Sequence, residues 1–248
     1  MGLLEGRRGR EWKVTVVLPA HNEVRGLRRA VEETVEFLES INQDFEILIA
    51  EDGSTDGTAD VARGIADSNL KVNWIHYDMR LGRGRALTEA FKKSSGSVLV
   101  YMDVDLSTEV RFLKPLIQAI IDGYDVATGS RGIAESLVSR SLKRAVASQL
   151  YNNLVRLLLD SNLQDHQCGF KAFNRESYLR IIDKVQAKHW FWDTEILVLA
   201  TRMGLRVKEV PVVWKEGEKT EVNLMRDFIR MGLQILKLWW RLDIGSLR

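Results

Sequence analysis

The sequence predicts an α/β fold with a mostly parallel sheet flanked by helices. Short apolar segments rich in β-branched residues alternate with longer segments of helical periodicity, as in β-α-β units. Each apolar segment ends in polar residues or glycines, so reactive side chains should lie along one edge of the sheet. The strongest such segment, residues 97–102, has the composition of a strand buried on both faces and leads into Asp103 and Asp105.

The first half of the chain predicts strands and helices in strict alternation. Residues 14–18 form the first strand, and strands are also predicted over residues 45–50, 72–77 and 97–102. The helix after the first strand has apolar residues spaced along one face, near Leu27, Val31, Val35 and Leu38. This order implies right-handed crossovers between parallel neighbours.

The second half continues the alternation less regularly. The predicted elements are a helix at 111–122, a strand at 124–131, a helical segment at 135–159, a helix that opens at 189–195 and a last strand at 207–214. Residues 165–171 have the mixed glycine and polar character of an active-site loop, and residues 215–220 form a charged loop. We expect a sheet domain over residues 1–224 and an amphipathic helix over residues 225–248.

The composition describes a globular chain with a large core. Of its 248 residues 45% are hydrophobic and 28% charged, and the net charge of +2 does not indicate a nucleic-acid partner. The one cysteine, Cys168, excludes an internal disulfide and is compatible with a reducing compartment. No stretch approaches the roughly 18 apolar residues of a membrane span. The N-terminal residues lack the apolar core of a signal peptide.

Asp103 and Asp105 are candidate metal ligands. Two carboxylates this close repel each other unless a cation lies beside them. A divalent metal that carries a phosphorylated ligand would meet this need, because hard cations bind oxygen and share it with phosphates. The alternative is a solvated pair, or a pair that caps the next helix.

A glycine- and arginine-containing turn follows the third predicted strand. Gly82 and Gly84 do not form a dinucleotide fingerprint, because the third glycine is absent and the motif does not follow the first strand. Arg80, Arg83 and Arg85 around flexible glycines are better suited to a pyrophosphate. A solvated basic turn is the alternative.

A second basic cluster is expected after residue 130. In the predicted helix from residue 135, Arg140, Lys143 and Arg144 are spaced to share one face. Together with Arg131 they could bind a phosphate that carries a lipid. The alternative is a solvated helix face.

The C-terminal helix, predicted over residues 225–242, has a broad apolar face with tryptophans and a narrow basic stripe. The stripe contains Arg226, Arg230, Lys237 and Arg241. This pattern favours a helix that lies in a membrane interface, with the protein peripheral on the cytoplasmic face. A helix packed on the domain and a dimer interface are the alternatives.

Six motifs, in this order, make the chain similar to the inverting family-2 glycosyltransferases of the GT-A fold. They lie at residues 19–23, 51–58, 103–105, 129–131, 165–171 and 192–195. The last three resemble those of the polyprenyl-phosphate sugar transferases, and most of all those of the dolichyl-phosphate β-glucosyltransferases. The resemblance extends from about residue 14 to residue 224.

The resemblance implies a donor site and a metal site. It assigns the nucleoside to Pro19, His21, Glu23 and Asp52. Asp103 would meet the ribose or the metal, and Asp105 would bind the metal between the diphosphate oxygens, with Gly82 and Arg83 on the donor side. The sequence departs from the family pattern at three positions: His21 replaces a tyrosine, Glu51 an aspartate and Ser107 a metal-binding glutamine of the mannosyl branch.

The resemblance also implies an acceptor site. It assigns the acceptor phosphate to Arg131 and Arg140, and Arg144 belongs to the same basic cluster. Asp103, Asp105, Arg131 and Arg140 therefore form the candidate catalytic set. Residues expected near the sugar or in the active-site loop are Asp165, Gln167, Lys171, Asp193 and Glu195. Asp193 and Glu195 either hold sugar hydroxyls or orient Lys171.

The function implied is inverting transfer of a hexose, with glucose expected, from a nucleotide diphosphate sugar to a polyprenyl phosphate. The expected donor is UDP-glucose, with GDP-mannose as the alternative, and the cofactor is Mg²⁺ or Mn²⁺. Other readings are a glycosyltransferase with a sugar or protein acceptor, a GDP-mannose-dependent mannose synthase and a non-enzymatic nucleotide-sugar sensor. A sugar-1-phosphate nucleotidyltransferase is disfavoured, because its glycine- and arginine-rich loop should directly follow the first strand.

Overall fold

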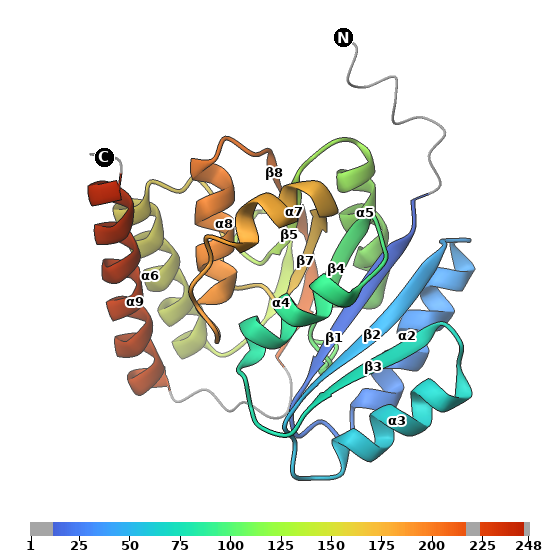
Figure 1. Ribbon diagram of the computed structural model, residues 1–248. Coiled ribbons are helices and arrows are strands. Elements are labelled where there is room, and N and C mark those ends of the chain that lie inside the picture. Colours follow the sequence, from blue (N-terminus) through green and yellow to red (C-terminus); the bar gives the residue numbers. More distant parts are fainter. Residues whose placement is uncertain (1–11, 217–223, 246–248) are drawn as a thin grey trace.

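The computed structural model describes residues 12–216 and 224–245 of the chain (Figure 1). At its centre is a seven-stranded sheet in the order β3-β2-β1-β4-β7-β5-β8. Its strands are β1 Val14–Ala20, β2 Phe45–Asp52, β3 Val72–Tyr77, β4 Val98–Met102, β5 Val126–Ser130, β7 Phe170–Asn174 and β8 Val207–Pro211. β7 runs antiparallel to β4 and β5, and the other neighbours are parallel, so the predicted mostly parallel sheet is confirmed.

Helices cover both faces of the sheet. One face packs against α2 Leu27–Ser40, α3 Thr58–Ser68, the short 3₁₀ helix η1 Val110–Phe112 and α5 Leu113–Ile121. The other packs against α4 Arg83–Lys93, α7 Arg175–Ile182 and α8 Trp192–Arg202. Alternate residues of β1 point to opposite faces of the sheet. Val16 and Leu18 belong to the core beneath α2, α3 and α5, and Val17 belongs to the core beneath α4, α7 and α8. Burial on both faces explains why this strand is apolar almost throughout.

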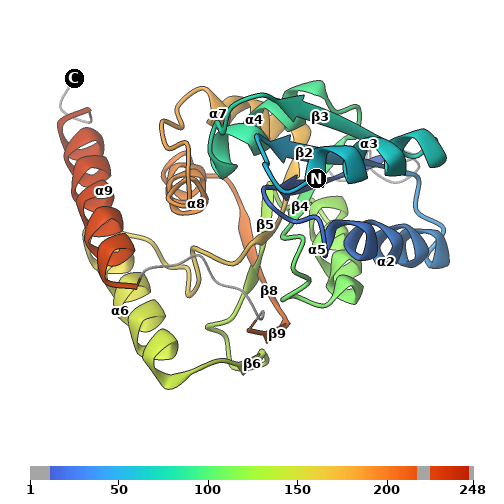
Figure 2. The same ribbon diagram turned by 90° about the horizontal axis from the view of Figure 1, so that it is seen from below.

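Two further helices lie outside α8. α6 Leu142–Leu159 and α9 Leu224–Gly245 pack side by side, as Figure 2 shows from below. Their shared core with α8 includes Tyr151 and Val155 of α6 and Ile235 and Leu238 of α9. α9 is the predicted C-terminal helix. Parts of two predicted segments lie outside what the structure describes. They are residues 217–220 of the charged loop, residues 246–248 of the C-terminal segment and the side chain of Arg226 in its basic stripe.

The structure corrects two predicted elements. Residues 170–171, expected in a loop, begin β7, whose five residues are all buried. Lys171 and Asn174 break the apolar pattern there, and the backbone of β7 is nevertheless paired with both β4 and β5. The helix expected from residue 135 begins at Leu142, because Leu137–Ser139 forms strand β6, paired with β9 Val213–Lys215.

Candidate functional site

The first three motifs meet at the C-terminal edge of the parallel strands. The register pairs Pro19 with Ala50, so β1 and β2 deliver their polar ends to the same place. The His21 Nδ1 atom lies 2.8 Å from the Asp52 carbonyl oxygen. The backbone N–H of Glu23 donates to the Thr58 hydroxyl at 2.8 Å. The residues predicted to hold the nucleoside are therefore gathered along one edge.

Asp52 holds the glycine turn in place. Its carboxylate accepts hydrogen bonds from the backbone N–H groups of Leu81 at 2.6 Å and Gly82 at 3.0 Å. Gly82 has φ +98°, and a Cβ there would lie 2.4 Å from the His189 Nδ1 atom. Glycine is needed at this position for both its backbone conformation and this close approach.

Arg83 faces carboxylates. Its Nη2 atom lies 2.6 Å from the Asp103 Oδ1 atom, and its Nη1 atom lies 2.6 Å from the Asp193 Oδ2 atom. Burial opposes its charge, but the charges of Asp103 and Asp193 outweigh burial and raise the pKa of Arg83. Its guanidinium lies 5.0 Å from the ring centres of both Tyr101 and Trp190. A direct contact between Arg83 and a donor diphosphate stays a prediction.

Asp103 and Asp105 lie just beyond β4 with an environment suited to a cation. The backbone N–H of Asp103 donates to the Gly169 carbonyl at 3.1 Å, and a Cβ at position 169 would lie 1.7 Å from Asp103 Oδ2. The carboxylate of Asp105 accepts from the backbone N–H of Ser107 at 2.9 Å and from its hydroxyl at 2.6 Å. Although Asp105 reaches solvent, the protein around it and the charge of Asp103 raise its pKa.

The pair fits a metal that takes its other ligands elsewhere. Within residues 12–216 and 224–245, no three His, Cys, Asp or Glu side chains gather as a metal site. Two carboxylates whose proximity raises the pKa of one of them would gain from a divalent cation between them. Oxygen atoms of a bound diphosphate or of water would have to complete the coordination.

Arg131 is held by Asp165. The Nε and Nη2 atoms of Arg131 lie 2.6 and 2.9 Å from the two carboxylate oxygens of Asp165. Burial opposes the ionisation of Asp165, but the charge of Arg131 outweighs burial and lowers its pKa. Asp165, expected near the sugar, thus orients an arginine that is expected to meet the acceptor.

Arg140 is not on the predicted helix face. It precedes Ser141, the N-cap of α6, and lies in the segment between β6 and that helix. Burial and the charge of Arg131 lower the pKa of Arg140. Both residues lie beside β9, because Arg131 contacts the Trp214 ring at 5.3 Å and β6, which ends one residue before Arg140, pairs with β9. Arg144 is on α6, where its Nη1 atom pairs with Glu216 at 2.9 Å.

The remaining predicted residues lie deeper in the fold. The Lys171 Nζ atom lies 2.9 Å from the Asp193 Oδ1 atom, so Asp193 does contact Lys171. Glu195 accepts hydrogen bonds from the backbone N–H groups of residues 186 and 187 and pairs with Arg241 of α9 at 2.5 Å. Gln167 contacts the sulfur of Met231 at 3.5 Å. Glu195 therefore holds helices together, and its expected contact with the sugar stays a prediction.

Sequence reasoning missed the groups that surround Arg83 and Asp103. Tyr101 lies in the apolar sequence of β4, where an aromatic residue is expected to be part of the hydrophobic core. Trp190 lies in an aromatic segment and is half exposed beside Arg83. The one available signal was Gly169, a glycine between two buried residues, which marks a close approach of the backbone to another group.

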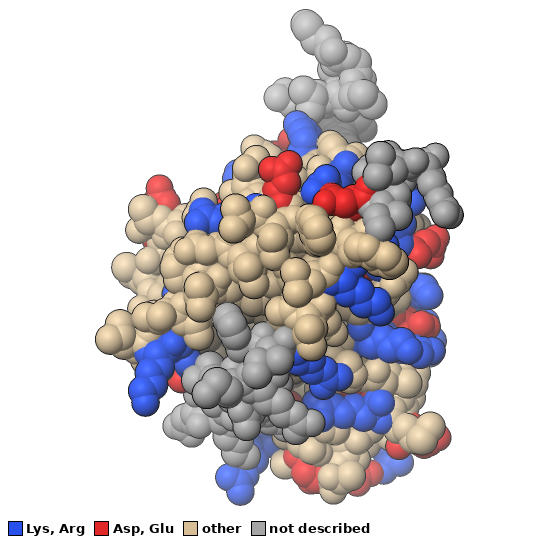
Figure 3. All heavy atoms as spheres, turned by 90° about the vertical axis from the view of Figure 1, so that its left-hand side faces the viewer, with Lys and Arg blue, Asp and Glu red and all other residues tan. Residues whose placement is uncertain are grey.

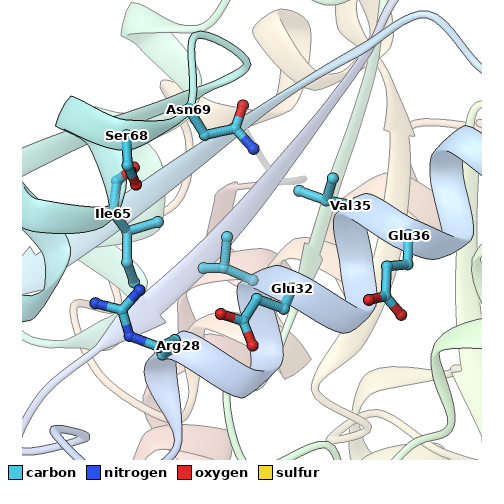
Figure 4. Close-up of a pocket in the computed structure, with 8 residues that line it drawn as sticks. Arg28, Glu32, Val35, Glu36, Ile65, Ser68 and Asn69 are labelled. Carbon is cyan, nitrogen blue, oxygen red and sulfur yellow. The ribbon is translucent and has the colours of Figure 1, made fainter.

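A hollow on the opposite flank is unrelated to this edge (Figure 4). It lies between α2 and α3 and is lined by Arg28, Val31, Glu32, Val35, Glu36, Ile65, Ser68 and Asn69. Its polar lining residues lie on the outer sides of the two helices and at the end of α3, and its apolar ones are Val31 and Ile65, which are buried, and Val35, which is partly buried. Because it includes none of the predicted site residues, the hollow does not mark the candidate active site.

Comparison with known proteins identifies the family. A model of the family described as glycosyl transferase family 2 matches residues 15–182. The chain belongs to this family. The matched residues include the nucleoside motifs, both aspartates after β4, and Arg131, Arg140 and Lys171. The strands that build the candidate site are therefore strands of a family 2 domain.

Curated relatives cover nearly the whole chain. Glycosyltransferase AglD of Haloferax volcanii is 48% identical over 94% of this chain, which spans only 38% of the length of AglD. The dolichyl-phosphate beta-glucosyltransferase of Saccharomyces cerevisiae is 28% identical over 93% of this chain and 76% of its own length. The human dolichyl-phosphate beta-glucosyltransferase is 27% identical over 95% of this chain and 78% of its own length.

Solved structures share the architecture. Glucosyl-3-phosphoglycerate synthase from Mycobacterium tuberculosis, in complex with Mn²⁺, UDP and glucosyl-3-phosphoglycerate, superposes with a TM-score of 0.68. The match covers 96% of this chain and 81% of that one at 20% sequence identity. The expected GT-A fold is thereby confirmed.

Proposed function

We propose that the chain transfers a hexose, with glucose as the first candidate, from a nucleotide diphosphate sugar to a polyprenyl phosphate. The observation that carries this proposal is that Arg131 and the segment bearing Arg140 both meet strand β9. The Arg131 guanidinium lies 5.3 Å from the Trp214 ring centre, and strand β6, which ends one residue before Arg140, pairs with β9. A phosphate acceptor needs such a cationic pair, whereas a sugar or protein acceptor does not. The names of the dolichyl-phosphate relatives support the same acceptor.

The acceptor phosphate would attack the anomeric carbon from the face opposite the leaving diphosphate, which inverts the linkage from α to β. A phosphate monoester is mostly ionised at neutral pH, so no strong general base is required. Arg131, oriented by Asp165, and Arg140 would grip its oxygens, because a guanidinium stays charged and offers a planar pair of donors. Rate would then depend mainly on alignment of the two phosphorylated groups.

Asp103 and Asp105 would hold a divalent metal, Mg²⁺ or Mn²⁺. When bound, the metal neutralises negative charge on the departing diphosphate. The nucleoside would lie against Pro19, His21, Glu23 and Asp52, with Gly82 near the diphosphate. UDP is the expected nucleotide, supported by the glucosyltransferase relatives and by the UDP that the Mycobacterium tuberculosis enzyme binds.

We also propose a membrane partner on the side of α6 and α9. Exposed apolar side chains on these helices are Leu142, Val146, Leu150, Leu157, Leu233, Leu236, Trp239 and Trp240. Figure 3 looks onto this side and shows uncharged side chains across its middle, with lysines and arginines along its lower part. A tryptophan-bearing apolar surface with a basic margin suits the interface of an anionic membrane, here taken as a cytoplasmic face.

The basic residues predicted to share one face of α9 do not all face solvent. Arg241 turns inward and pairs with the buried Glu195, while Arg230 and Lys237 are exposed. Within the described part of the chain, none of the helices combines the length and apolar character needed to cross a membrane. In the proposed membrane contact, the exposed apolar side chains of α6 and α9 would face the lipid together.

Replacing Leu236 and Trp240 with serine should weaken binding to liposomes that contain anionic lipid. Loss of two exposed apolar side chains removes interfacial contact, with an expected drop in partitioning on the order of tenfold. Co-sedimentation with the liposomes measures this, and Leu70→Ser, a fully exposed leucine far from α9, is the matched control. Equal binding by the double variant and wild type would refute the proposed surface.

A donor and acceptor panel tests the function itself. The protein is incubated with a polyprenyl phosphate, Mg²⁺ or Mn²⁺, and either UDP-glucose, UDP-N-acetylglucosamine, a UDP-uronic acid or GDP-mannose, and the glycolipid is detected by mass spectrometry. We expect product with UDP-glucose, and tighter competition by UDP than by GDP. Product only with GDP-mannose would replace the glucosyl assignment. Metal-dependent donor binding without any transfer to lipid phosphate would refute the proposed reaction.

A further inference from the structure

Four charged side chains of alternating sign form a row that leads inward from the candidate metal site. Asp103, Arg83, Asp193 and Lys171 follow one another with contacts of 2.6, 2.6 and 2.9 Å. Exposure falls along the row, from 37% for the side chain of Asp103 to 11% for Arg83, 3% for Asp193 and 0% for Lys171. The row thus connects a solvent-accessible carboxylate to the fully buried amino group of Lys171, whose pKa burial lowers to about 7.

Aromatic groups keep this row in one arrangement. The Tyr101 hydroxyl donates a hydrogen bond to Asp193, and its ring lies beside both Arg83 and Lys171. Trp190 covers Arg83 on the outside. A guanidinium held between rings and carboxylates cannot swing toward another partner without breaking several contacts at once. The row is therefore a buried, well-ordered network rather than a surface ion pair.

The charges determine what Asp103 presents to a cation. With Asp193 ionised, Arg83 is shared between two carboxylates, and Asp103 keeps negative charge available at its exposed side. With Asp193 neutral, Arg83 would have Asp103 as its only carboxylate partner, and the Lys171 amino group would lose its carboxylate partner. The stronger hold of Arg83 on Asp103 makes the site less attractive to a divalent metal.

We propose that Asp193 is a positioning residue for the metal site. Together with its partner Lys171, it sets how strongly Arg83 binds Asp103. The strength of that contact in turn sets the affinity of Asp103 and Asp105 for a divalent cation. The proposal rests on the proposed metal-dependent function and adds residues that do not touch the metal. It also gives Arg83 a defined task. Arg83 adjusts the negative charge that Asp103 presents to a metal, in addition to any contact with the donor.

The test measures Mn²⁺ binding to the full chain in the presence of UDP and without acceptor, by the electron paramagnetic resonance signal of free Mn²⁺. Asp193→Asn should weaken Mn²⁺ binding about tenfold, the usual scale for groups that orient metal ligands. Lys171→Met removes a cation, so its Mn²⁺ binding should be equal to or tighter than that of wild type. The double variant should return to within about threefold of wild type, because the opposing charges are removed together.

Opposite effects of the two single variants distinguish positioning from simple damage to the fold. Both should lower the melting temperature, since each removes one hydrogen-bonded partner from a buried charged group. Glu46→Gln is the control, because Glu46 is a hydrogen-bonded carboxylate at the far end of the sheet, beside Thr15 and Ser95. It should lower the melting temperature and leave Mn²⁺ binding unchanged.

Two results would overturn the proposal. One is Mn²⁺ binding by Asp193→Asn within about twofold of wild type, below the usual scale for such groups. The other is an equal loss of binding in Asp193→Asn, Lys171→Met and Glu46→Gln, which would follow from stability alone. Because no acceptor is present, these outcomes are independent of whether the chain transfers sugar to a lipid phosphate. Failure of the transfer assay with this binding pattern intact would refute only the proposed reaction.

Discussion

Asp105→Asn is expected to abolish metal-dependent turnover while the fold remains intact. The amide keeps the size of the side chain and can still accept from Ser107, but it cannot supply the negative charge that a hard cation prefers. Loss of one such electrostatic contact typically costs about 10²–10³ in rate. The measurement is the initial rate of glycolipid formation over a range of Mg²⁺ and Mn²⁺ concentrations, with the melting temperature as a check on folding.

The structure adds a second expectation for this variant. The charge of Asp103 raises the pKa of Asp105, so removal of the Asp105 charge relieves a repulsion. Asp105→Asn should thus be at least as stable as wild type, in contrast to its loss of activity. Asp67→Asn, on the exposed side of α3, is the matched control and should behave as wild type in both measurements. Retention of more than about a tenth of the rate, against the usual loss, would exclude Asp105 as a metal ligand.

Arg140→Ala should impair use of the acceptor and spare the donor. Arg140 is partly buried, so its charged hydrogen bonds to a phosphate would be worth roughly 10- to 100-fold in kcat/KM for polyprenyl phosphate. Donor affinity, measured by calorimetry with UDP and metal, should stay nearly unchanged. Lys143→Ala, an exposed cation in the first turn of α6, is the control for a general effect of positive charge.

Acceptors of different prenyl length distinguish a defect in binding the acceptor phosphate from a defect in binding the membrane. Arg140→Ala should be equally impaired with long and short prenyl phosphates, because the loss occurs at the phosphate. The Leu236 and Trp240 double variant should be impaired mainly with long acceptors presented in liposomes. Weaker donor binding with unchanged acceptor kinetics in Arg140→Ala would instead assign the basic pair to the nucleotide, and the lipid-phosphate proposal would lose its main physical support.

The parallel half of the fold and the sheet edge that carries the candidate site could both be predicted from the amino-acid sequence. Strands β1 and β4 are apolar almost throughout, and β2 is apolar at its centre, because both faces of these strands are buried, and that pattern is visible in the local sequence. The carboxyl ends of parallel strands meet at one edge, so the polar motifs after them had to converge. The C-terminal helix was equally predictable, since its periodicity is strong over its whole length.

The partners of the charged residues could not be predicted from the sequence, because they depend on how distant elements pack together. Lys171 is a polar residue in the middle of β7, and it is tolerated there because Asp193, distant in sequence, lies 2.9 Å away. Arg140 lies in a non-helical segment next to β9, because the pairing of β6 with β9 delays the start of α6. Arg83 bonds to carboxylates from β4 and α8, an arrangement that no spacing in the sequence encodes. Burial makes each of these charges depend on a counter-ion supplied by another element, so their roles follow from packing and not from local pattern.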